Sequence, residues 1–159
     1  MRKILVSMAA GAALLLGMAA PATAATTGAQ TINYAVFGDG ESGMVSATGP
    51  IQGTGTSVVL TDDGEGSGTD KVTFKGGSFV ISHTDSSSTQ SFNERTCIGR
   101  FSGAGDYTLG SGTGAYKGVS GGGTYTYRGT FFGTRTADGC GDDGTVLFTV
   151  RARGTTTLP

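Results

Sequence analysis

The chain lacks tryptophan, and only two of its 159 residues are cysteine, three are proline and one is histidine. The missing tryptophan disfavours an immunoglobulin-type sandwich, whose disulfide packs against a buried tryptophan. With His83 as the single histidine and no Cys-x-x-Cys, the usual zinc ligand sets are absent, so we expect neither metal nor cofactor. No Gly-x-Ser-x-Gly elbow leads into a helix, which disfavours a catalytic triad.

The N-terminus has the layout of a secretory signal peptide. Two basic residues, Arg2 and Lys3, precede an apolar, alanine-rich run over residues 4–20, and small residues stand at Ala22 and Ala24. We expect residues 1–24 to be a Sec-type signal helix cleaved near Ala24, which exports the protein. An uncleaved anchor helix is the alternative, although the run is shorter than the roughly 20 residues that span a bilayer.

Residues 25–159 are long enough for one domain with its own core. Without Arg2 and Lys3 the chain holds 9 basic and 12 acidic residues, a net charge of −3. This weakly acidic balance disfavours nucleic acid and anionic membranes as partners. No later stretch is apolar enough to span a bilayer.

Both cysteines, Cys97 and Cys140, lie in the exported part of the chain. An even count in an exported protein indicates a disulfide, here closing a loop of about 43 residues. A metal pair and a catalytic thiol are the alternatives.

Apolar and polar residues alternate along most of the exported chain, and no glycine-free window has helical periodicity. Alternation that gives a strand one buried face and one solvent-exposed face is typical of antiparallel sheets. Glycine makes up 28 of the 135 exported residues, and several glycines lie within strands, where they permit the coiling that a closed barrel requires. We therefore predict an all-β, antiparallel, eight-stranded closed barrel, with a serine-rich loop at residues 85–90. The predicted strands are 31–36, 44–51, 57–61, 71–75, 78–84, 96–109, 124–135 and 145–153.

Residues 110–127 contain seven glycines around Lys117, which raises the question of a phosphate loop. A Walker loop needs its lysine directly after the last glycine and a hydroxyl residue next, whereas here Lys117 precedes Gly118. The dinucleotide fingerprint fails as well, because Lys117 occupies its third glycine position and a strand follows. We interpret the stretch as a tight corner between two strands, in which Tyr116 plugs the end of the barrel.

The segment Gly-Thr-Gly-Ala-Tyr-Lys-Gly-Val-Ser-Gly-Gly-Gly-Thr-Tyr, residues 112–125, resembles the glycine-rich segment of allene oxide cyclase-like and dirigent-like barrels. In particular it resembles small secreted actinobacterial proteins of unknown function that carry this barrel. The resemblance implies a calycin-like barrel of eight strands, a ligand-sized interior and a homo-oligomer, with trimers as one form. The acidic residues that plant members use match no position here, so the resemblance carries over no catalytic residue.

His83 is the residue to weigh first for chemistry, because it shares a strand face with Phe79 and Ile81. It is the one candidate for a catalytic group and also a candidate ligand contact, and a hydrogen-bonded histidine at a strand end is the alternative. Tyr107 and Tyr125 join it as candidate ligand-binding residues of the lumen or rim, together with Asp106. We interpret the other polar clusters as structural rather than functional. The acidic turn at residues 62–65 and Asp70 are interpreted as a solvated hairpin, and residues 138–144 as a disulfide-pinned hairpin. Glu94, Arg95 and Arg100 are interpreted as surface charges.

The sequence leaves three functions open, and it contains no recognisable set of catalytic residues. The first is non-catalytic binding of a small apolar ligand or an extracellular surface by a secreted barrel. The second is an isomerase or cyclase of the allene oxide cyclase-like type, with His83 as its ionisable group. The third is a cell-wall or carbohydrate module that uses outer threonines at 124, 126, 130 and 155–157.

Overall fold

The computed structural model describes residues 24–159. Along this part of the chain the elements are β1 (Thr26–Gly38), β2 (Ser42–Thr48), β3 (Gly53–Asp62), β4 (Ser67–Phe74), β5 (Gly77–Asn93), β6 (Ile98–Gly110), the 3-10 helix η1 (Gly114–Tyr116), β7 (Ser120–Thr136) and β8 (Gly139–Leu158). The signal-helix prediction falls almost wholly on residues 1–23, which lie outside the described residues. Nowhere between residues 24 and 159 is there a helix long and apolar enough to cross a membrane.

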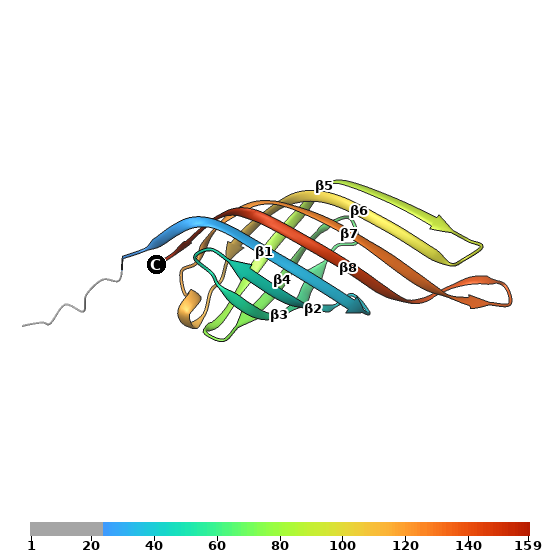
Figure 1. Ribbon diagram of the computed structural model, residues 1–159, viewed down its shortest axis with the longest axis horizontal. Coiled ribbons are helices and arrows are strands. Elements are labelled where there is room, and N and C mark those ends of the chain that lie inside the picture. The colour runs from blue at the N-terminus through green and yellow to red at the C-terminus, as the bar shows by residue number, and fades with distance from the viewer. Residues whose placement is uncertain (1–23) are drawn as a thin grey trace, which may run out of the picture.

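The eight strands form one antiparallel sheet that closes on itself. Each strand pairs with the next in sequence, and β8 returns to pair with the whole of β1 from Thr26 to Gly38. Figure 1 shows β1 and β8 running side by side across the front of this ring. The prediction of an all-β, antiparallel fold is confirmed.

The strands differ greatly in length, and this gives the barrel its shape. Strands β2, β3 and β4 have 7 to 10 residues, whereas β5, β7 and β8 have 17 to 20. The hairpins β5–β6 and β7–β8 therefore project well beyond the rest of the ring, as Figure 1 shows. The serine-rich loop predicted at residues 85–90 is wrong, because these residues continue β5 and pair with β6.

One half of the barrel is a packed core. Phe79, Ile32 and Val72 have no exposed surface, which follows from the inward-facing positions of their alternating strands, and Ile51 between β2 and β3 is equally buried. Tyr116 of η1 closes this end, with its ring centroid 5.5 Å from that of Phe79 and 6.0 Å from that of Phe74. The sequence-based prediction that Tyr116 plugs the barrel is confirmed.

The glycine-rich segment is the corner that seats this plug. A side chain at Gly112 would place its Cβ 1.7 Å from the carbonyl oxygen of Tyr116, and one at Gly114 would lie 2.2 Å from that of Gly76. Gly114 also adopts a left-handed backbone, with φ of 57°. The glycines are therefore required by close packing of backbone on backbone at the closed end.

The two cysteines form a disulfide, as predicted, with Cα atoms 5.4 Å apart. Cys97 lies in the turn before β6, and Cys140 is the second residue of β8. The bridge thus joins the outer ends of the two projecting hairpins. Residues 138–144 form the disulfide-pinned hairpin that the sequence predicted.

Candidate functional site

The other half of the barrel is open and holds a cavity of about 820 Å³. Inward-facing residues of the ring form its wall, and the β3–β4 hairpin and the β1–β2 turn form its rim. The apolar and aromatic part of the wall consists of Tyr34, Val36, Val59, Ile81, Phe101, Tyr107, Tyr125, Tyr127, Phe148, Val150 and Ala152. A cavity of this size is in the range that takes a small organic molecule.

Asp85 on β5 lines the cavity at its mouth, next to the β3–β4 hairpin of the rim. It accepts hydrogen bonds from the hydroxyl groups of Tyr125 and Tyr127, one on each carboxylate oxygen. Both tyrosines stand on β7, two strands away, and their rings stack with centroids 6.2 Å apart. The carboxylate is therefore held in one orientation by two neighbouring phenols.

Two glycines on β6 make this arrangement possible. Gly105 pairs with both Asp85 and Tyr125, so these three residues form one row across the sheet. A Cβ at Gly105 would lie 2.6 Å from the Tyr125 hydroxyl, and one at Gly103 would lie 2.5 Å from that of Tyr127. The two phenol rings lie over β6 in the space that side chains at these positions would fill.

A β-bulge lies next to Asp85. The pairing register of β5 with β6 shifts between Asp85 and Ser87, which leaves Ser86 unpaired, and the Ser86 hydroxyl lies 3.1 Å from the carbonyl oxygen of Ala104. The backbone N–H of Asp85 donates instead to Gly66 of the β3–β4 hairpin, at 2.8 Å. Bulges commonly re-aim side chains beside functional sites, and this one fixes the hairpin against the mouth.

A second carboxylate, Asp70 on β4, lies deeper in the cavity beside His83. The His83 Nε2 and an Asp70 carboxylate oxygen are 3.9 Å apart, and both side chains are roughly three-quarters buried. Burial raises the pKa of Asp70, the nearby imidazole opposes this, and Asp62 adds to the rise. The imidazole edge packs against Tyr125, with centroids 5.9 Å apart. His83 is thus a cavity residue in mid-strand, so its expected place at a strand end is wrong.

Two further tyrosines bring polar atoms to the cavity wall without a partner. Tyr34 and Tyr107 are 7% and 3% exposed, and their buried hydroxyl groups make no hydrogen bond among the described residues. Burial raises the pKa of both phenols, and Asp70 and then Tyr107 raise that of Tyr34 further. These hydroxyls therefore stay protonated at neutral pH and lack a hydrogen-bond partner within residues 24–159.

Tyr125 and Tyr127 are also stabilised as neutral phenols. Burial first, and then the Asp85 carboxylate, raise the pKa of Tyr127 to about 12 and that of Tyr125 further still. The cavity therefore presents four protonated phenols around two carboxylates and one imidazole.

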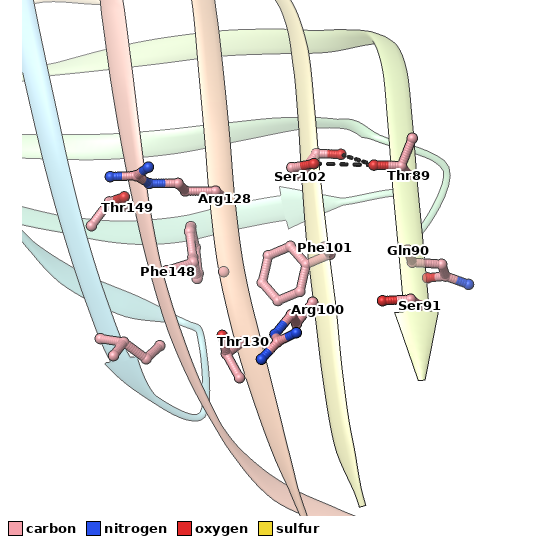
Figure 2. A pocket seen from close by; sticks show the side chains of 12 residues that line it. Thr89, Gln90, Ser91, Arg100, Phe101, Ser102, Arg128, Thr130, Phe148 and Thr149 are labelled. Atoms are coloured by element: carbon pink, nitrogen blue, oxygen red, sulfur yellow. Dashed lines mark hydrogen bonds between the residues drawn. The ribbon is translucent and has the colours of Figure 1, made fainter. Parts of the chain in front are cut away.

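A shallower hollow of about 670 Å³ adjoins the mouth along the projecting strands. Figure 2 shows Phe101 and Phe148 on either side of β7, where both pair with Gly129. Arg100, Arg128 and Thr130 lie on the same part of the sheet, and Thr89 and Ser102 are 3.0 Å apart through their hydroxyl oxygens. Phe101 and Phe148 also line the main cavity, so the two spaces share this part of the wall.

The structure places some of the residues predicted from the sequence in the cavity and others outside it. His83, Tyr107 and Tyr125 all line the cavity, and Asp70 joins them although it was assigned to a solvated hairpin. Asp106 is exposed on the outer face, and Thr156, expected on that face, is fully buried. Glu94 and Arg95 are exposed in the β5–β6 turn, where the Glu94 carbonyl accepts from Arg135 at 2.7 Å.

Sequence reasoning missed Asp85, Tyr127 and Tyr34 as site residues. Asp85 and Tyr127 continue the period-two series of His83 and Tyr125, and this was the available signal. Among residues 24–159, no group of three or more His, Cys, Asp or Glu side chains is placed to hold a metal ion.

Comparison with known proteins gives no relative from which a role for these residues can be read. No protein-family model, curated protein or solved structure matches this chain.

Proposed function

We propose that this protein is a secreted, non-catalytic binder that holds a small, mainly apolar ligand in the open half of a calycin-like barrel. The observation that carries this proposal is the open cavity, whose largely apolar wall contains the unpaired hydroxyls of Tyr34 and Tyr107. Buried polar groups are normally paired, so two unpaired phenols in the wall of one cavity favour a ligand that supplies their partners.

The division of the barrel into two halves supports binding over a purely structural role. The half around Phe79 and Tyr116 is solidly packed and supplies the rigidity. The half around Tyr125 and Val150 is hollow, and up-and-down barrels of eight strands have room for one small ligand. The disulfide and the signal-like N-terminus favour an extracellular place of action.

Two tryptophan variants test the proposal. Val150→Trp places a large ring in the cavity, whereas Thr126→Trp adds the same ring on the outer face of neighbouring β7. Binding of the neutral apolar dye Nile red, followed by fluorescence, should be lost in Val150→Trp and retained in Thr126→Trp. Equal binding by both variants places the dye elsewhere and contradicts the proposal. Native mass spectrometry of protein from its own culture medium should further show a retained small molecule.

An isomerase or cyclase is the second candidate, favoured by the pairing of His83 with Asp70 inside the cavity. An imidazole beside a carboxylate can exchange a proton with a bound ketone. Wash-in of solvent deuterium into the α-position of 4-phenylbutan-2-one should then be faster with the wild type than with His83→Ala. Equal rates in the two proteins would count against catalysis and leave the binding function.

A further inference from the structure

The charge of the cavity points to one class of ligand. Its wall and rim carry six carboxylate side chains and no lysine or arginine among the described residues, and His83 is the one basic group. The carboxylates are Asp39, Glu41, Asp62, Glu65, Asp70 and Asp85. Because such a space repels anions and attracts cations, the net potential favours a positively charged ligand.

The two inner carboxylates are placed to receive a cation. Tyr125 and Tyr127 fix the Asp85 carboxylate and leave its remaining lone pairs free. The Asp70 carboxylate accepts no side-chain hydrogen bond within residues 24–159, and the His83 imidazole lies 3.9 Å from it. A carboxylate that is three-quarters buried and so weakly paired gains from a bound donor.

The unpaired phenols are an independent observation that points to a ligand. Tyr34 and Tyr107 are more than nine-tenths buried, line the same cavity and lack partners for their hydroxyls. Asp70, Tyr34 and Tyr107 all line this cavity, so its wall combines a carboxylate with two unpaired phenols. An ammonium group can donate to the carboxylate and to a phenol oxygen at the same time.

The surrounding wall fits the rest of such a ligand. The stacked rings of Tyr125 and Tyr127 and the side chains of Phe148 and Val150 offer aromatic and aliphatic contact. Aromatic faces also attract organic cations through their quadrupole. A bare metal ion is disfavoured, since no three ligand side chains converge in the described chain.

We infer that the cavity binds a small organic cation, an ammonium group attached to an apolar or aromatic body, with the inner carboxylates Asp70 and Asp85 attracting the ammonium. The body lies against Tyr125, Tyr127 and Val150. This inference rests on the proposed function and specifies the class of ligand.

Three probes of similar size and different charge test the inference. They are 2-phenylethylammonium, neutral 2-phenylethanol and anionic 3-phenylpropanoate, each titrated into the wild type by NMR with calcium chloride as a fourth arm. We expect the ammonium to bind at least about tenfold more tightly than the alcohol, the ratio for one charge-assisted contact, and the propanoate to bind least. Shifts should centre on the cavity tyrosines.

Two carboxylate variants then test which residues bind the ammonium group of the probe. Asp70→Asn and Asp85→Asn should each lower affinity for 2-phenylethylammonium about tenfold or more and leave 2-phenylethanol unchanged. Asp138→Asn removes the same charge from the exposed β7–β8 turn and should change neither. The wild-type order of the three probes is a readout that needs no variant to fold.

The outcomes separate the two proposals. If 2-phenylethanol binds as tightly as the ammonium, the cation inference is overturned and the binding function stands. If calcium binds at these residues and the ammonium does not, a metal site replaces the inference. If none of the small molecules shifts any cavity resonance and Nile red binding also survives in Val150→Trp, both proposals fail.

Discussion

The hydroxyl of Tyr125 on β7 donates a hydrogen bond to Asp85 on β5, passing over the strand that separates them. The residue beneath the ring is Gly105, which pairs with both partners. The contact spans two strand spacings, roughly 10 Å. It is possible because the Tyr125 side chain is long and Gly105 beneath it has no side chain to block it. This relationship makes Asp85 a fixed anion at the mouth, and it has measurable consequences.

Removing the charge at Asp85 should make the phenols easier to ionise. The carboxylate raises the pKa of Tyr127, which is about 12, but burial is the larger cause. Asp85→Asn should therefore lower this pKa while keeping it above the ordinary value of 10.0. Ultraviolet titration of phenolate formation measures the change, with Asp138→Asn as control. An unchanged titration curve in Asp85→Asn would show that the two hydroxyls do not depend on this carboxylate.

Stability should fall in alkaline solution. The pKa values of Tyr34, Tyr107, Tyr125 and Tyr127 are raised in the folded protein, so between pH 10 and 12 the folded state holds more protons than the unfolded state. Their contribution is complete below pH 10, the unfolded value, and is lost as pH rises through the folded values. Urea unfolding at steps across this range should show the loss, and Tyr127→Phe should reduce its slope. A free energy of unfolding that stays constant there would contradict the prediction.

The closed half of the barrel could be predicted from sequence because its signals are local. Strict alternation around Phe79 and Val72 identifies buried strand faces, and the glycines around Tyr116 mark a corner. The turn between β4 and β5 is Lys75-Gly76, and Gly77 begins β5 with φ of 148°.

The open half was harder to predict because its residues act on distant neighbours. Residues of β5 beyond Thr84 have no partner on β4, so their exposed polar side chains look like a loop. The role of Asp85 depends on phenols 40 and 42 residues away. Glycines within strands were interpreted as points of coiling, whereas Gly103 and Gly105 also make room for the rings that reach Asp85.

The plug at the closed end should be a large contributor to stability. Tyr116 is buried against Phe74 and Phe79, and its removal leaves a cavity between them. Tyr116→Ala should lower the free energy of unfolding by about 3–5 kcal/mol, the usual cost of deleting a buried aromatic ring. Tyr116→Phe keeps the ring and serves as the matched control, with a much smaller loss. Urea unfolding measures the free energy of unfolding of both variants. Similar losses in the two would show that the hydroxyl, and not the ring, carries the effect.

The hydrogen bonds of the buried Gln30 side chain should also contribute to the stability of the fold. The two N–H donors of the Gln30 amide are shared among the carbonyl oxygens of Thr31, Thr48 and Ile51 at 3.0–3.1 Å, and its oxygen accepts from the N–H of Ile51 at 2.9 Å. Gln30→Leu leaves these groups unpaired, which should cost about 1–3 kcal/mol for each buried group. The same change at exposed Gln52 should cost little. Equal melting temperatures of the two variants would refute a clamp at Gln30.

The bridge between Cys97 and Cys140 should stabilise the fold without shaping the cavity. It closes a loop of 43 residues and ties the tips of the two projecting hairpins, away from Tyr34 and Tyr107. The double variant Cys97→Ser, Cys140→Ser should lose about 2–4 kcal/mol and several degrees of melting temperature, because the unfolded chain regains the loop entropy. Faster amide exchange should appear first at the hairpin tips, and cavity probes should bind with unchanged affinity. Thiol titration of the denatured, unreduced wild type should find no free thiol. Two titratable thiols would exclude the bridge, and a large loss of ligand affinity in the double variant would show that the tips and the cavity are coupled.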